Sequence, residues 1–293
     1  KNFNINNVLG IEPCRNIARI ARNKKIKVIS DYWTKKLSQK IKKKYGKFEI
    51  IFSANTITHI KNFDEVFSAV NNVLDEDGIF IIQDPSLLEL LINNAYDQFY
   101  NEHIYVFSYI SLSNILKKHG LAIFHLENIK DHGGSIRYYI KKISSNFKIA
   151  NSVKIQKRKE INFGLNSFLT YKKFSDRVEG SKRKLVALFK KLKKRKKNII
   201  GYGATAKAVT VLNYCKIDNK YIDYFVDTTP EKQGKYMPGV KIPVKKYFKL
   251  NKNKIDYAFL GAWNFKSEIR SKEQKFISKR GKFITHIPIP KVI

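Results

Sequence analysis

Cysteine is almost missing from this chain of 293 residues, which has only Cys14 and Cys215. The two lie far apart and do not have the spacing of metal ligands, which favours free thiols in a reducing cytoplasm. Long apolar runs are also missing: no stretch is long enough to span a bilayer, and the first residues do not form a signal peptide. We therefore expect a cytoplasmic protein with no metal site in this chain and no membrane partner.

Acidic residues are few: 24 Asp and Glu oppose 58 Lys and Arg, for a formal net charge of +34. Such a charge is typical of proteins that bind nucleic acid or a membrane surface. Here, however, Lys far outnumbers Arg and is spread along the whole chain, whereas readers of phosphates and base edges use Arg. We expect no nucleic-acid partner, and a positive field that attracts a small anionic substrate.

Hydrophobic residues make up 43% of the chain, which indicates a globular protein with room for two domains. Short apolar runs alternate with amphipathic helical runs, as in a parallel sheet covered on both faces. The run at 48–53 has the composition of a buried strand, and the apolar spacing at 63–74 predicts a helix. A second unit of the same kind begins at residue 198, with strands expected at 199–204, 224–227, 255–260 and 282–287.

Residues from about 150 to 197 have no strand signals and are expected to be helical. In the segment 181–197 one helical face carries apolar side chains, and Lys and Arg fill the rest. The four apolar residues are Leu185, Leu188, Phe189 and Leu192. A solvated basic helix that packs this stripe on its neighbours is favoured over a helix that binds anions or nucleic acid.

Tyr100, Glu102 and His103 place a phenol, a carboxylate and an imidazole within four residues. A His beside such groups can accept a proton near neutral pH and hold the resulting charge, which makes His103 a candidate general base. Taken alone, the same run is also compatible with a polar surface loop.

Three polar residues follow strand-like runs, where ligands bind in open α/β sheets. Glu12 ends the first run, and an acid at that position normally accepts the ribose hydroxyls of a nucleoside. Such an acid should be preceded by a strand and a Gly-rich turn, so we expect the chain to be an N-terminally truncated piece of a longer protein. Asn55 could bind the cofactor, and His59 near the same edge could be a ligand or a structural histidine.

Two Gly turns are candidates for binding an anionic substrate. Residues 131–137 contain Gly133 and its neighbour glycine, with Ser135 and Arg137 suited to phosphate or carboxylate. Residues 201–207 resemble a phosphate-binding turn at the start of a helix, with Lys207 placed for a phosphate and Asp227 for a ribose. Either could also be a simple tight turn.

Taken in order, these runs resemble the sugar C-methyltransferases that act on nucleotide-linked 4-keto-deoxyhexoses. The matching runs are residues 10–13, 54–60, 100–103, 132–137, 201–207, 226–239, 262–264 and 287–290. Position 101 is Asn, where many members of that family have a second His. The family has a zinc-binding N-terminal domain, a methyltransferase domain that uses S-adenosylmethionine, and a Rossmann-like C-terminal domain.

The resemblance implies an α/β fold: an incomplete class I methyltransferase (Rossmann-like) domain at 1–148, a helical connector at 149–197, and a second Rossmann-like domain at 198–293. It implies that S-adenosylmethionine is the cofactor, and that zinc is bound only by a missing N-terminal domain. The partner would be a nucleotide-diphosphate sugar. It assigns catalysis to His103 as base with Glu102 and Tyr100 as helpers, cofactor binding to Glu12, Asn55 and His59, and substrate binding to His132, Gly133, Ser135, Arg137, Tyr202 and Lys207.

Two other classes remain open from the residues alone. One is an NAD(P)-dependent sugar oxidoreductase that uses the turn at 201–207 and Asp227. The other is a non-catalytic basic protein that binds nucleotides or nucleic acid. The exact sugar, the methylated carbon, the nucleotide base and the oligomeric state do not follow from the sequence.

Overall fold

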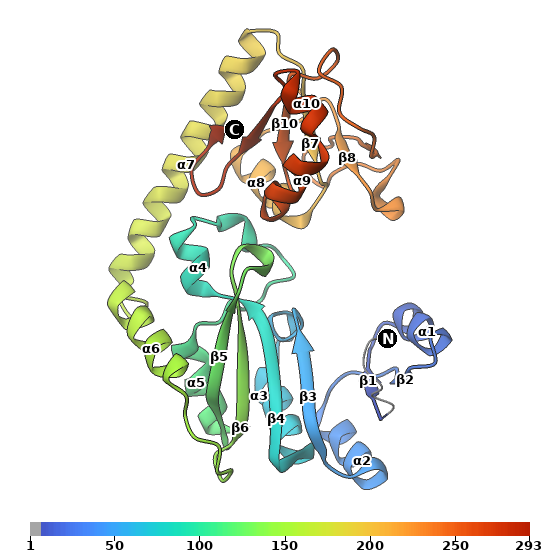
Figure 1. The fold of residues 1–293 in the computed structure, drawn as a ribbon, viewed down its shortest axis with the longest axis vertical. Helices are drawn as coiled ribbons and strands as arrows, with labels where there is room; N and C mark the ends of the chain where they lie inside the picture. Colours follow the sequence, from blue (N-terminus) through green and yellow to red (C-terminus); the bar gives the residue numbers. More distant parts are fainter. Residues whose placement is uncertain (1–6) are drawn as a thin grey trace. The chain divides into compact units, whose positions relative to one another are not determined.

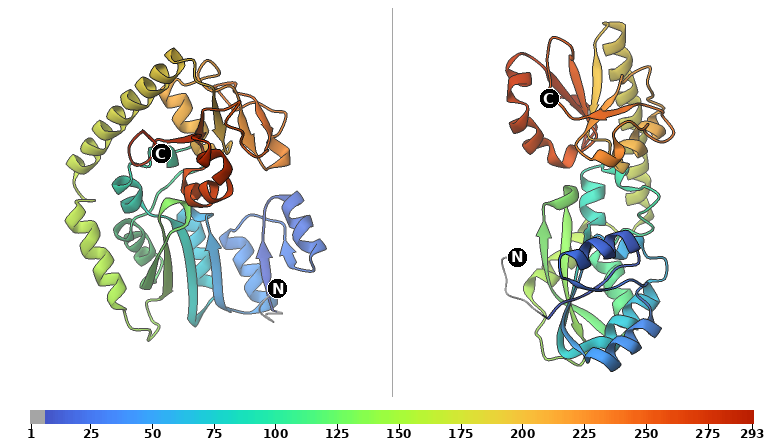
Figure 2. Two further views of the ribbon diagram at one scale, coloured as in Figure 1. Left: turned by 45° about the horizontal axis from the view of Figure 1, so that its top comes forward. Right: turned by 90° about the vertical axis from the view of Figure 1, so that its right-hand side faces the viewer.

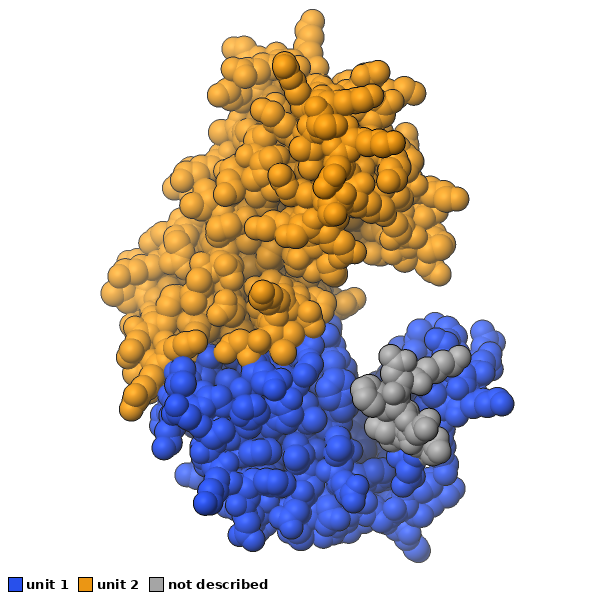
Figure 3. All heavy atoms as spheres, viewed as in Figure 1, with its two compact units in different colours: residues 1–84, 109–127, 136–157 blue, residues 85–108, 128–135, 158–293 orange. Residues whose placement is uncertain are grey.

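The computed structural model describes residues 7–293, which fall into two compact units (Figure 3). Unit 1 contains the residues up to 84 together with 109–127 and 136–157, and unit 2 contains 85–108, 128–135 and 158–293. Each unit is therefore assembled from segments that are not consecutive in the sequence. The sequence-based domain boundaries at 148/149 and 197/198 stay a prediction, and each unit is described here by itself.

Unit 1 holds most of the residues of twelve elements (Figure 1). They are β1 (Leu9–Ile11), α1 (Arg15–Asn23), β2 (Lys27–Ile29), α2 (Lys35–Tyr45), β3 (Phe48–Ala54), η1 (Ile57–His59), α3 (Phe63–Val73), β4 (Leu74–Pro85), α5 (Tyr109–Lys118), β5 (Leu121–Ile129), β6 (Ser135–Lys142) and α6 (Asn151–Phe163).

The strands of unit 1 form two separate sheets. β1 pairs with β2 in parallel, and a four-stranded sheet has the order β3-β4-β6-β5, in which β3 and β4 are parallel. The expectation of a fully buried strand at 48–53 is wrong, because Ile50 and Phe52 are 64% and 60% exposed. The physical reason is that β3 is the terminal strand of its sheet, so the apolar run does not become a central, doubly covered strand.

The helix α3 shows how local sequence builds the core of unit 1. Asn62 caps its first turn by accepting a hydrogen bond from the backbone N–H of Glu65 at 3.1 Å. Helical spacing then places Val66, Phe67 and Val70 on one buried face. Phe67 meets Phe80 of β4 edge to face, with 6.5 Å between ring centroids, which joins the helix to the four-stranded sheet.

Unit 2 holds the remaining elements (Figures 1 and 2). They are α4 (Leu87–Ile92), η2 (Tyr96–Gln98), η3 (Asp131–Gly133), α7 (Phe168–Lys194), β7 (Ile199–Tyr202), α8 (Ala206–Cys215), β8 (Phe225–Asp227), η4 (Pro230–Lys232), β9 (Val244–Lys246), β10 (Tyr257–Leu260), η5 (Trp263–Phe265), α9 (Lys266–Lys272), α10 (Gln274–Ser278), β11 (Lys282–Thr285) and β12 (Lys291–Val292).

The six-stranded sheet of unit 2 has the order β12-β11-β10-β7-β8-β9. All neighbours are parallel except β12, which is antiparallel to β11. Numbered from β7, the parallel strands have the order 3-2-1-4-5 of a doubly wound sheet, with the strand order reversing between β7 and β10. In such sheets ligands bind beyond the carboxyl ends of the strands at this reversal.

The helical prediction for 150–197 is confirmed by α6 and by the 27-residue helix α7, which runs as one continuous rod in Figure 2. Leu185, Phe189 and Leu192 are buried in the core of unit 2, and Leu188 packs against that core. The stripe therefore packs inside the unit, as expected of a solvated basic helix with one apolar face.

Candidate active site

Tyr100 and His103 form a hydrogen-bonded pair in unit 2, just after η2. The hydroxyl oxygen of Tyr100 lies 2.6 Å from Nε2 of His103, and the two ring centroids are 4.0 Å apart. Nδ1 of the same imidazole lies 2.9 Å from the carbonyl oxygen of Gln98. Because a carbonyl oxygen can only accept, Nδ1 carries the proton, and Nε2 of the neutral ring is left as the acceptor.

The surroundings keep Tyr100 protonated and so support this arrangement. Burial, followed by the negative charges of Glu102 and Asp97, raises the pKa of Tyr100 to about 12. Its hydroxyl can therefore donate to Nε2 of His103 at neutral pH. Glu102 is exposed and acts on the phenol through its charge. The structure thus brings Tyr100 and His103 together as expected, while the role of Glu102 stays a prediction.

The Gly turn at 131–134 lies beside this pair. The side-chain amide Nε2 of Gln98 donates to the carbonyl oxygen of His132 at 2.5 Å, so the residue that holds His103 also holds the turn. Ser135 is buried, and its hydroxyl donates to the carbonyl oxygen of Asp131 at 3.0 Å. Ser135 therefore closes the turn, and substrate contacts from His132, Gly133 and Ser135 stay predictions.

Lys207 reaches the same region from the first turn of α8. Its side chain is buried, and burial lowers its pKa while the charge of Asp97 acts in the opposite direction. Burial also lowers the pKa of His132, and the charge of Lys207 adds to that effect. A buried ammonium group near His132 and Asp97 adds a positive charge to the region of the His103 pair, as an anionic substrate requires.

Arg137 belongs to unit 1, and its guanidinium is already bound. Nε and Nη2 donate to the side-chain oxygen of Gln83 at 3.0 and 2.7 Å, and Nη1 lies 3.4 Å from a carboxylate oxygen of Glu127. An incoming phosphate would have to compete with these contacts. The predicted substrate contact of Arg137 remains a prediction. In the structure its side chain links β6 to β4 and β5 through these hydrogen bonds.

The turn at 201–207 is explained by packing. A Cβ on Gly201 would lie 2.3 Å from the ring of Phe225, and one on Gly203 would lie 2.8 Å from Cβ of Ala262. The hydroxyl of Tyr202 is buried and donates to the carboxylate of Glu273 at 3.1 Å. These glycines let β7 pack closely on its neighbours, and Tyr202 contacts the protein core; its predicted contact with substrate stays untested.

Asp227 does not offer a carboxylate for a ribose. Its Oδ2 accepts the backbone N–H of Ala204 at 2.7 Å, its Oδ1 accepts that of Thr229 at 2.8 Å, and only 8% of the residue is exposed. A dinucleotide site needs the acid to bind the ribose hydroxyls and needs free amides in the Gly turn. Here the acid and the turn bind each other, which argues against the NAD(P)-dependent oxidoreductase.

The three candidate cofactor ligands lie in unit 1, and two of them, Glu12 and Asn55, directly follow strands. Glu12 follows β1, and its Oε1 accepts the backbone N–H of Cys14 at 2.8 Å, while Oε2 has no hydrogen bond within residues 7–293. Asn55 follows β3 with φ of 50°, and its N–H donates to the carbonyl oxygen of Gln83 at 2.8 Å. His59 ends η1. The free oxygen of Glu12 fits a ribose hydroxyl, so the residues present fit S-adenosylmethionine.

Asp84 is a residue that sequence reasoning missed. It ends the run of β4, is 1% exposed, and neither of its carboxylate oxygens has a hydrogen bond of ordinary geometry within the described part of the chain. Burial raises the pKa of Asp84 to about 7, partly offset by Thr58 and the backbone of Thr56. An acid that is separated from the apolar run 79–82 only by Gln83 is the signal that could have found it, since an acid at the end of such a run also singled out Glu12.

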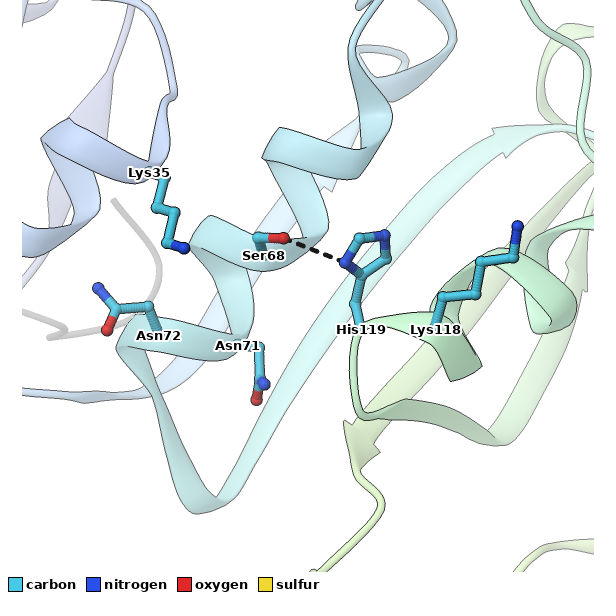
Figure 4. A pocket seen from close by; sticks show the side chains of 6 residues that line it. All are labelled: Lys35, Ser68, Asn71, Asn72, Lys118 and His119. Carbon is cyan, nitrogen blue, oxygen red and sulfur yellow. Dashed lines mark hydrogen bonds between the residues drawn. The ribbon is translucent and has the colours of Figure 1, made fainter.

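A surface pocket lies elsewhere in unit 1. It encloses about 390 Å³, and Figure 4 shows its six lining residues: Lys35, Ser68, Asn71, Asn72, Lys118 and His119. His119 is held by Ser68 at 3.1 Å and by Asp64 at 2.8 Å. A smaller cavity of about 140 Å³ in unit 2 is lined in part by Gly133 and Trp263, and so borders the Gly turn. Only the smaller one touches a predicted site residue.

The described residues, 7–293, contain neither a cluster of metal-ligating side chains nor a membrane-spanning helix. In that range no group of three or more His, Cys, Asp and Glu side chains is arranged to hold a metal ion. None of the helices described is both long and apolar enough to cross a bilayer.

Sequence comparisons decide the class. Residues 130–288 match the model for the C-methyltransferase C-terminal domain, and residues 1–126 match a model for a methyltransferase domain. Over 286 residues the chain is 32% identical to the C-methyltransferase NovU of Streptomyces niveus, covering 98% of this chain and 68% of that protein. The chain belongs to the C-methyltransferase family. This C-methyltransferase is an enzyme that depends on S-adenosylmethionine.

Solved structures resemble this C-methyltransferase more weakly. An S-adenosylmethionine-dependent methyltransferase from Clostridium acetobutylicum is 17% identical, with a TM-score of 0.34 over 46% of this chain and 75% of that one. A possible histamine N-methyltransferase from Thermotoga maritima is 16% identical, with a TM-score of 0.36 over 46% and 72%. TM-scores of this size do not establish a shared fold, so the assignment depends on the sequence matches.

Proposed function

We propose that this C-methyltransferase moves a methyl group to a carbon next to the ketone of a nucleotide-diphosphate-linked deoxysugar. The observation that carries this proposal is the hydrogen bonding of His103, whose Nδ1 lies 2.9 Å from the carbonyl oxygen of Gln98 and whose Nε2 lies 2.6 Å from the Tyr100 hydroxyl. A carbonyl oxygen only accepts, so Nε2 of the neutral ring is the acceptor. Methylating such a carbon requires a base, because a C–H bond has to be broken before the carbon can attack.

The steps assign one task to each side chain of the pair. Nε2 of His103 takes the proton from the carbon, and the electron pair of that bond moves to form the enolate. The resulting imidazolium keeps its Nδ1–H on the carbonyl oxygen of Gln98. In this step the hydroxyl of Tyr100, which stays protonated, turns from Nε2 of His103 to the enolate oxygen and donates to it, and Glu102 orients the sugar. When bound, S-adenosylmethionine supplies the electrophilic methyl group.

Binding of the anionic substrate depends on positive charge near this base. Lys207 is buried at the start of α8 and lies close enough to His132 to lower its pKa. Together with the excess of basic residues, it favours a diphosphate-bearing substrate. We include His132, Gly133, Ser135, Arg137 and Tyr202 in the same proposal on the strength of the family motif alone.

Glu12 is proposed to bind the ribose of S-adenosylmethionine, and Asn55 and His59 of the same unit are proposed as further cofactor ligands. Glu12→Gln should weaken cofactor binding by about 10-fold or more, since hydrogen bonds to charged groups are worth roughly 1.5–3 kcal/mol. Calorimetry on the full-length protein measures this, with the exposed Glu49→Gln of β3 as control. Equal cofactor affinity in the two variants would remove Glu12 from the role.

The substrate class is tested with matched pairs of nucleotide sugars. The enzyme is given labelled S-adenosylmethionine and a nucleotide-linked 4-keto-deoxyhexose, or the same sugar with a hydroxyl in place of the ketone. We expect carbon methylation of the ketone only, because the alcohol has no acidified C–H bond. Equal transfer to both sugars, or transfer to oxygen, would contradict the proposal.

A further inference from the structure

Asp97 is a fully buried carboxylate in η2, directly before the residue that holds His103. Its Oδ2 accepts two hydrogen bonds, from Nε1–H of Trp263 at 2.6 Å and from Nε2 of His286 at 3.0 Å. Asp97 and His286 are 0% exposed and Trp263 is 8% exposed. A carboxylate buried to this degree is retained only where strong donors offset the cost of removing it from water.

The donors come from the ligand-binding edge of the six-stranded sheet. Trp263 lies just after β10, and His286 lies just after β11. Lys207, whose pKa is raised by the charge of Asp97 against the larger effect of burial, follows β7. The carboxyl ends of these strands are where a doubly wound sheet binds an anion. In this unit they bind a carboxylate of the chain itself.

Trp263 and the neighbour of Asp97, Gln98, both contact the Gly turn at 131–134. The indole of Trp263 occupies the space beside Gly133, where a Cβ would lie 2.2 Å from Cη2 of the ring. The carbonyl oxygen of the preceding residue, His132, accepts a hydrogen bond from the side-chain amide of Gln98 at 2.5 Å. Because Gln98 is the neighbour of Asp97, these contacts join η2, η3 and η5. We call the contacts of Asp97 with Trp263 and His286, together with those to the Gly turn, the clamp.

We propose that Asp97 is a positioning residue, which through Trp263 and His286 fixes η2 so that the carbonyl of Gln98 receives Nδ1–H of His103. This inference rests on the proposed role of His103 as base. Without the anchor the carbonyl of Gln98 would move, and the hydrogen bond that favours the neutral form with the proton on Nδ1 would weaken. The form with the proton on Nε2 cannot accept a proton from the substrate at that nitrogen.

The test uses Trp263→Phe, which removes the N–H donor and keeps an aromatic ring, and Asp97→Asn, which removes the charge and keeps the shape of the side chain. Nitrogen-15 NMR of the substrate-free enzyme reports which ring nitrogen of His103 is protonated. We expect Nδ1–H in the wild type, and a mixture of both forms in each variant. The kcat should fall by about 10²-fold with little change in KM, as for a misplaced catalytic group.

Tyr247→Phe is the matched control, because it removes a different donor to a buried carboxylate of unit 2, the bond of 2.7 Å to Glu273. It should lower stability and leave the protonation of His103 unchanged. If Asp97→Asn does not fold, Trp263→Phe alone decides. A folded Trp263→Phe with His103 still fully protonated on Nδ1 and with wild-type kcat would overturn the inference. Since the NMR reading needs no turnover, it stands apart from failure of the proposed reaction.

Discussion

His103→Ala lowers the rate of methyl transfer by about 10²–10⁴-fold, the contribution expected of a positioned general base. The imidazole is the group whose Nε2 is kept as acceptor, through its contacts with Tyr100 at 2.6 Å and with the carbonyl of Gln98 at 2.9 Å. Removing it takes away the group that is proposed to accept the proton from carbon. Single-turnover assays with saturating substrates measure the chemical step, and titration of the nucleotide sugar measures binding.

The affinity for the sugar should change little in this variant, because the role assigned to His103 is proton transfer. His125→Ala is the control, since His125 is a half-buried histidine of β5 that contacts Ser152. A His103→Ala enzyme with an unchanged chemical step would exclude His103 as the base. A variant with an unchanged chemical step and weaker sugar binding would make it a binding residue.

Gly133→Ala destabilises unit 2 by roughly 2–5 kcal/mol. Overpacking costs typically 1–3 kcal/mol, and a left-handed backbone about 1–2 kcal/mol for a residue with a Cβ. Both apply here: φ is 90°, and the new methyl group would lie 2.2 Å from the ring of Trp263. Chemical denaturation followed by the fluorescence of tryptophan measures the change.

Gly180→Ala provides the opposite case in the same unit. Gly180 lies inside α7, and a Cβ there would meet nothing within 4 Å. Alanine should therefore stabilise the helix by about 0.5–1 kcal/mol. If the two substitutions changed stability equally, the close packing of Trp263 on the Gly turn would be refuted.

The sequence predicted most elements, because apolar spacing of period 2 or 3.6 reports which face is buried. It missed α2, whose Lys-rich sequence reads as a charged run. Leu37 and Ile41 bury one narrow stripe of that helix, and Thr34 caps its start. The exposure of Ile50 and Phe52 could not be predicted either, since local composition does not tell which strand ends a sheet.

Contacts within the candidate site could be predicted only where its residues are close in the sequence. Tyr100 and His103 are three residues apart, so their contact follows from a single turn. The clamp depends on Trp263 and His286, which lie 166 and 189 residues from Asp97, and no local pattern reports such distant pairs. The packing of the Gly turn at 201–207 could not be predicted for the same reason: its glycines lie against Phe225 and Ala262, which only the folded sheet brings near.

The central claim, that His103 makes an enolate from a keto sugar, is tested most directly by deuterium uptake. The enzyme and a nucleotide-linked 4-keto-deoxyhexose are incubated in deuterium oxide without S-adenosylmethionine, and proton NMR follows the hydrogens on the carbons next to the ketone. The account predicts that the wild type exchanges one of these hydrogens and that His103→Ala does not. Exchange at the wild-type rate in His103→Ala would contradict it.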